Sequence, residues 1–179
     1  MPVYRQGSLD GLCGLYAVVN ALSRVFRGID ANALTEWLVL ALEQRDGLVA
    51  AFLKGTNRTD VSWLLWHASA FCEETLGHQL NVASPHWSRR PHSHRQFVRM
   101  VQDALEQHYV PLVGFRCAEG GHWAVVAGVD GNRFRFADSA VGGTRLAPTS
   151  TVTGSSRPSR ILHIEAGCTF LLGQGAMSH

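Results

Sequence analysis

The sequence lacks the cysteine spacing of a metal site and has no long hydrophobic run. No C-x-x-C pair and no Cys/His spacing typical of zinc is present, so we expect neither a metal nor another cofactor. The four cysteines are Cys13, Cys72, Cys117 and Cys168. Apolar runs such as Trp37 to Leu42 are far too short to span a membrane.

The first residues also lack the features of a leader. The chain starts Met-Pro-Val-Tyr-Arg-Gln, without the basic and then apolar residues of a signal peptide. We therefore expect reduced thiols and a cytoplasmic location, or export without a signal peptide if the protein is an effector.

The sequence has no excess of charge of either sign, because 16 Lys and Arg residues nearly balance 14 Asp and Glu residues. Basic residues do gather between His86 and Arg99, which would suit an acidic partner or a nucleic acid. The alternative is a solvated loop that leads into a helix, and we favour it because no aromatic platform for nucleic acid accompanies the charges. His92 and His94 have no third ligand at useful spacing, so a metal is not favoured there either.

The composition is that of a globular chain, with 46% hydrophobic and 17% charged residues. The length of 179 residues fits one domain with one sizeable core. We expect that domain to cover residues 1–172 and to be followed by a flexible tail over 173–179. Nothing in the sequence indicates an oligomeric state.

Helical periodicity dominates the first half of the chain and strand-like segments dominate the second. The predicted helices cover 13–26 (ended by Gly28), 30–42 (capped by Asp30), 59–71 (capped by Thr59 or Asp60) and 93–108. The predicted strands cover 110–117, 122–129, 133–138, 161–164 and 168–172, with a hairpin turn at Asp130-Gly131-Asn132 and an irregular loop over 140–160. Helices followed by an antiparallel sheet define an α+β fold.

A glycine-rich turn delivers Cys13 to the start of the first predicted helix. Unpaired N–H groups and the positive end of the helix dipole meet at such a position, and both favour a thiolate. The backbone N–H of Cys13 and the side-chain amide of Gln6 are candidate donors to an oxyanion, and Gly11 and Gly14 leave room for a substrate backbone. Taken alone, however, Cys13 is better explained as a small buried residue, which is the commonest role of a free cysteine.

His122 opens one strand of the predicted hairpin and Asp138 closes the next. The two lie equally far before and after Asp130, so a hairpin centred there would put them about 5 Å apart, with a bulge able to adjust the facing. Asp138 could then hold one ring nitrogen while the other takes a proton from the thiol. Trp123 adjoins His122 and would shield this base from water.

The segments around Cys13 (with Gln6 upstream), Gly121-His122-Trp123 and Phe136-Ala-Asp138-Ser139 resemble papain-like cysteine peptidases, and most closely the C39-like group. The resemblance implies a papain-like fold, with N-terminal helices packed on a C-terminal antiparallel sheet. It also implies Cys13 as nucleophile, His122 as base, Asp138 as orienting acid and Gln6 in the oxyanion hole. Ser139 stands where the family often has proline, and the insert from Asp30 to Ser93 has no matching motif.

The resemblance therefore predicts a cysteine peptidase that cleaves an amide bond in a protein or peptide, acidic substrates included. Gly11, Gly14, Gly121 and Trp123 are its candidate substrate-binding residues. Other functions stay open. The same triad could serve peptidoglycan amide hydrolysis, removal of a ubiquitin-like modifier, deamidation or acyl transfer, including in a bacterial effector toxin. A binding module that kept only the fold is less favoured, because it would not need all four catalytic residues.

Overall fold

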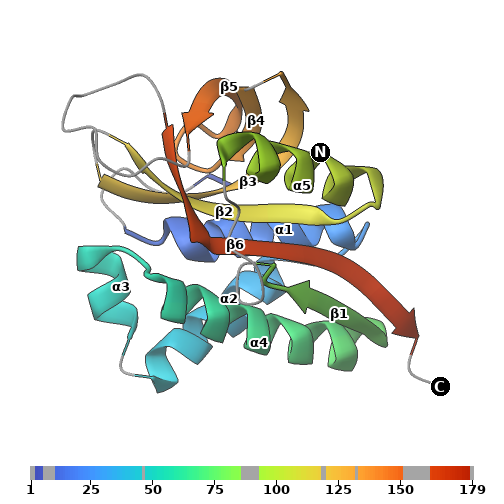
Figure 1. Cartoon of the computed structure of the whole chain (residues 1–179). Helices are drawn as coiled ribbons and strands as arrows, with labels where there is room; N and C mark the ends of the chain where they lie inside the picture. The colour runs from blue at the N-terminus through green and yellow to red at the C-terminus, as the bar shows by residue number, and fades with distance from the viewer. Residues whose placement is uncertain are drawn as a thin grey trace.

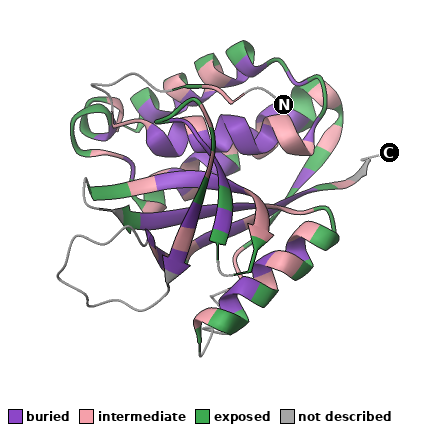
Figure 2. Ribbon diagram, turned by 90° about the horizontal axis from the view of Figure 1, so that it is seen from above, coloured by how far each residue is buried: buried purple, intermediate pink, exposed green. Residues whose placement is uncertain are grey.

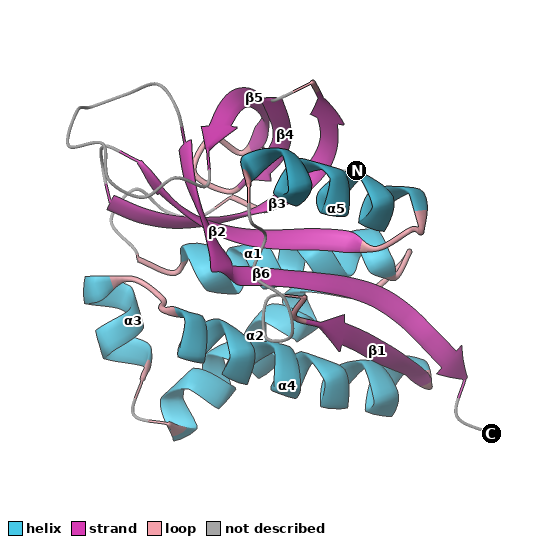
Figure 3. Cartoon of the chain, in the orientation of Figure 1, coloured by secondary structure: helices cyan, strands magenta, loops and turns pink. Residues whose placement is uncertain are grey.

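Helices and strands alternate only in the middle of the chain. The computed structural model describes residues 3–5, 11–45, 47–85, 93–117, 120–131, 133–150 and 162–177. Its helices are α1 (Cys13–Val25), α2 (Ala31–Gln44), α3 (Leu48–Lys54), α4 (Arg58–Leu76) and α5 (His94–Glu106). Its strands are β1 (His78–Ala83), β2 (Val110–Cys117), β3 (Gly120–Asp130), β4 (Arg133–Asp138), β5 (Gly143–Ser150) and β6 (Leu162–Met177). The fold is therefore α+β with a six-stranded sheet (Figures 1 and 3).

Local capping signals fix most helix starts. The Asp30 side chain accepts hydrogen bonds from the backbone N–H groups of Asn32 and Ala33. The prediction that Asp30 caps this helix is therefore confirmed. The predicted caps of the third helix, Thr59 or Asp60, are wrong. Asn57 is the N-cap of α4, and the Asp60 carboxylate accepts the Asn57 N–H in a reciprocal capping box. Helix α3 and strand β1 have no counterpart among the predicted elements.

The sheet has the strand order β1-β6-β2-β3-β4-β5, and all of these neighbours are antiparallel. A short parallel pairing of β5 with β6, at Thr149 and Leu162, closes the sheet on itself. The long strand β6 thus pairs with three other strands, β1, β2 and β5. Its pairing with β1, which directly follows α4, connects the helical half of the chain to the rest of the sheet.

The prediction is wrong in three places along the last third of the chain. Residues 143–150 form β5, although Pro148 and the small polar residues around it predict a loop; residues 151–161 lie outside the described part. The strands predicted at 161–164 and 168–172 are one strand, whose pairing with β2 shifts register between Ile164 and Thr169. The expected flexible tail is β-structure from Gly173 to Met177, because β1 pairs with it.

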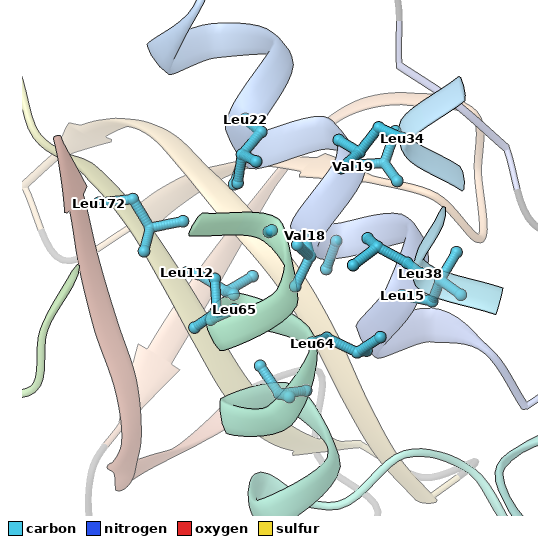
Figure 4. Close-up of a cluster of buried hydrophobic side chains, with 14 of the residues drawn as sticks. Leu15, Val18, Val19, Leu22, Leu34, Leu38, Leu64, Leu65, Leu112 and Leu172 are labelled. Atoms are coloured by element: carbon cyan, nitrogen blue, oxygen red, sulfur yellow. The ribbon is translucent and has the colours of Figure 1, made fainter. Parts of the chain in front are cut away.

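Two layers of apolar side chains cover opposite faces of the sheet. On one face, leucines and valines of α1, α2 and α4 meet Leu112 of β2 and Leu172 of β6 (Figure 4). On the other face, α5 packs through residues such as Phe97 against Phe134 and Phe136 of β4. Figure 2 shows that α5 is buried on one side only, whereas α1 is buried along most of its length. Within the described ranges, no helix is both long and apolar enough to cross a membrane.

Candidate active site

Cys13 lies at the first position of α1, and a loop far along the chain braces it. The side-chain hydroxyl of Thr56, between α3 and α4, accepts a hydrogen bond from Gly14 N–H at 2.8 Å. The same oxygen lies 3.8 Å from Cys13 Sγ. No side chain of the preceding residue caps α1, so Thr56 supplies the acceptor that a local cap would otherwise provide. Cys13 is only 5% exposed.

His122 and Asp138 lie side by side at the end of the β3–β4 pair. His122 Nε2 is 2.7 Å from Asp138 Oδ1. Direct opposition across the hairpin does not occur: Val125 pairs with Ala137, so Ala124 takes the next position and faces Asp138. His122 lies two residues further along the same face and reaches Asp138 diagonally. The register does shift between Val126 and Gly128, at a bulge.

Asp138 is fully buried and uses both carboxylate oxygens. Oδ1 also accepts the backbone N–H of Ala140 at 3.0 Å. Oδ2 lies 2.8 Å from Nε of Arg145 on β5, close enough for an ion pair although the N–H does not point along the line to the oxygen. Arg145 in turn lies over the ring of Phe115, which also packs edge-on against His122. The acid is therefore held by three neighbours.

His122 also interacts with Cys13, and this contact sets the charges of the pair. Burial alone would raise the pKa of the Cys13 thiol. The hydrogen bond and charge of His122, with hydrogen bonds from Thr56 and from the Trp123 backbone, outweigh burial and lower that pKa below its ordinary 9.0. Since Nε2 is engaged by Asp138, Nδ1 is the ring nitrogen left for the sulfur.

The pKa of His122 moves the opposite way. Burial lowers it, but hydrogen bonds and charges of Asp138 and Cys13 dominate and raise it to about 9. Burial raises the pKa of Asp138, and its contacts with His122, Arg145 and Ala140 overcome this and lower it. Near neutral pH these shifts favour a thiolate, an imidazolium and a carboxylate in a row.

The structure brings only some of the predicted site residues together. Cys13, His122 and Asp138 come together at one place. Gln6 lies outside the described residues. Gly11 and Gly14 lie against the chain's own backbone and side chains, because an added Cβ would be 2.6 Å from Gly55 N and 2.3 Å from Thr56 Oγ1, respectively. On that side, close packing of the α3–α4 loop requires the two glycines.

Trp123 and Gly121 lie at the site but have different surroundings. The Trp123 indole is buried and donates from Nε1 to the Thr56 carbonyl at 2.9 Å, so it braces the same loop that contacts Cys13. The ring that packs against His122 is that of Phe115. Gly121 is exposed on β3, and a Cβ there would meet nothing within 4 Å.

A hollow of about 580 Å³ opens beside His122. The end of α3, the start of α4 and strands β2, β3 and β6 form its walls. Thr56, Gly121, His122 and Trp123 are among its lining residues, so it adjoins the Cys13–His122 pair. This volume lies within the range of sites that hold small molecules or short peptide segments.

Two residues of the site were not predicted from the sequence. Thr56 is a single polar residue in a loop without a motif, and only the tertiary approach of Gly14 makes it an acceptor. Arg145 lies in the stretch predicted to be irregular, and the alternation of side chains around Ala147 and Thr149, both buried in β5, was the one available hint. Among the described residues, no three His, Cys, Asp or Glu side chains cluster as metal ligands would.

No model of a protein family matches the chain, and no curated protein is significantly similar to it.

Proposed function

We propose that the protein is a papain-like cysteine peptidase, nearest in its motifs to the C39-like group, that cleaves an amide bond with Cys13, His122 and Asp138. The observation that carries this proposal is the position of His122, which contacts the buried Asp138 at 2.7 Å and the helix-start thiol of Cys13. This chemistry requires a nucleophile, a base that contacts it, and an acid that contacts and orients the base.

The reaction begins with the Cys13 thiolate. It attacks the carbonyl carbon of the scissile amide, and the resulting oxyanion accepts hydrogen bonds from Cys13 N–H and the Gln6 side-chain amide. The N–H of the first helical residue is not used by the helix itself, which supports its part in this role. Removal of the Gln6 amide by Gln6→Ala is expected to cost on the order of 10²–10³ in rate.

The His122 imidazolium then gives its proton to the leaving nitrogen, and the C–N bond breaks to leave an acyl group on Cys13. The neutral imidazole next removes a proton from water, which attacks the thioester. The acid product leaves and the thiolate–imidazolium pair is restored. Asp138 keeps the ring oriented and stabilises its charged form throughout.

A peptide mixture from a digested proteome tests this proposal. The native protein, Cys13→Ala and Cys72→Ala are incubated with the mixture, and new peptide ends are identified by mass spectrometry. Cys72 is a buried cysteine of α4 whose pKa is raised to about 12 by burial, so its variant is the matched control. We expect cuts from the native protein and Cys72→Ala but none from Cys13→Ala. Identical products from all three would rule out the peptidase.

A further inference from the structure

The hollow beside His122 is lined in part by aromatic side chains and in part by the backbone of glycines. Phe115 and Trp123 contribute the aromatic part of its lining. Gly120 and Gly121 contribute backbone to the lining, and among the described residues an added Cβ at either would meet nothing within 4 Å. Gly120 has a φ of 124°, which favours glycine at this position. A peptide backbone can therefore approach β3 immediately before the base.

Cations outnumber acids among the described side chains that line the hollow. Lys54, Arg58 and Arg116 are the cations, and Glu165 is the acid. Glu165 is already occupied. One of its oxygens pairs with Arg116, and the other lies 3.4 Å from the Cys168 thiol, which donates to it. The register shift of β6 against β2 falls at this place and brings Glu165 and Cys168 to the wall.

Lys54 and Arg58 are the two other cations in the lining of the hollow. Lys54 is exposed at the end of α3 and is the only lysine in the sequence. Arg58 opens α4, with its guanidinium over the ring of Phe170. The two cations and the glycine pair Gly120 and Gly121 reach the hollow from different elements.

We propose that this hollow is a specificity site for an acidic side chain of the peptide substrate, within two residues of the scissile bond. The carboxylate is recognised by Lys54, with Arg58 adding positive charge to the lining, and the stem of the side chain lies along Phe115 and Trp123. Because His122 lines the hollow and Cys13 does not, the bound residue is a neighbour of the reacting one. This inference rests on the proposed peptidase activity.

The peptide-mixture experiment tests it when Lys54→Glu and Arg99→Glu are added. Arg99 is an exposed cation of α5, on the opposite face of the sheet, so its variant makes the same change in net charge away from the hollow. With the native protein, we expect Asp and Glu to be enriched about three- to tenfold at one position within two residues of the cut. Lys54→Glu should lose or invert this enrichment, Arg99→Glu should keep it, and added NaCl should weaken it.

The outcomes separate the two proposals. Cuts that require Cys13 but show no preference for acidic residues would overturn the specificity site and leave the peptidase standing. The specificity site is likewise overturned if Arg99→Glu changes the preference as much as Lys54→Glu does. Cuts that do not require Cys13, or no cuts at all, would overturn the peptidase and the site together. The rate of Cys13 alkylation by iodoacetamide, measured on each variant, shows whether the thiol pair is intact.

Discussion

Arg145 faces the carboxylate oxygen of Asp138 that His122 leaves uncovered, with its Nε 2.8 Å from Oδ2. Asp138 is 0% exposed, whereas the Arg145 side chain is 36% exposed. A buried carboxylate between a histidine and an arginine keeps its charge as the pH falls. The strand β5, absent from the sequence prediction, is therefore part of what holds the acid in place.

Replacement of Arg145 by Met should destabilise the protein by about 1–3 kcal/mol, less than for a fully buried pair because solvent reaches Arg145. The pKa of Asp138 is lowered in the folded protein, so its stabilisation is present above its ordinary pKa and is lost as pH falls. Acid unfolding of Arg145→Met should thus begin at a higher pH than in the native protein, as urea titrations across pH will show. Arg145→Lys should recover part of the difference, and an unchanged acid transition in Arg145→Met would contradict this role of Arg145.

The Cys13 thiol should react with alkylating agents at a lower pH than an ordinary cysteine does. Its pKa is lowered mainly by His122 acting against burial, so His122→Ala should move the midpoint of iodoacetamide alkylation to a higher pH. Peptide cleavage should also decline as pH rises through about 9, where His122 loses its proton. Cys168, whose pKa burial and Glu165 raise to about 11, is the internal reference. Equal pH profiles for Cys13 and Cys168 would argue against the ion pair.

Asp138→Asn keeps the shape of the side chain but removes the charge that raises the pKa of His122. We expect a loss of cleavage rate on the order of 10²–10⁴. The raised pKa of His122 stabilises the fold fully below about 6.5, and this contribution is lost as pH rises through about 9. In Asp138→Asn, that pH dependence of unfolding should shrink. Asp130→Asn, at the exposed end of β3, should change neither measurement.

Thr56→Val tests the loop that braces the nucleophile. Valine has nearly the same shape but cannot accept the Gly14 N–H, so a buried donor is left unpaired at a cost of about 1–3 kcal/mol. The pKa of Cys13 should rise, because the Thr56 hydroxyl helps to lower it. Thr56→Ser keeps the hydroxyl and should restore the alkylation profile. If Thr56→Val and Thr56→Ser behave alike in urea unfolding and alkylation, the hydroxyl has no such role.

Local signals in the sequence were sufficient for much of the frame. The N-cap Asp30 and the apolar runs of β2 and β4 gave their bounds directly, because capping groups and alternating burial act over a few residues. The neighbours of the site were not accessible in this way. Thr56 and Arg145 gain their roles only when α1 meets the α3–α4 loop and β5 meets β4.

The hollow illustrates the same limit. Its walls come from five elements, and the polar Glu165 that interrupts the predicted strands marks a register shift, not an end of β6. Pairing between β1 and the last residues of β6 is likewise a contact between segments far apart in the chain, which no local pattern records.

The opposite pKa shifts of two buried cysteines make the protein a reporter of its own folding. Folding lowers the pKa of Cys13, which needs His122 and Thr56 beside it, and raises that of Cys72 to about 12 within α4. Folded molecules should therefore label at Cys13 at a lower pH than at Cys72. On unfolding, both thiols return toward the same ordinary value, so the ratio of the two labels measures the folded fraction without any added dye.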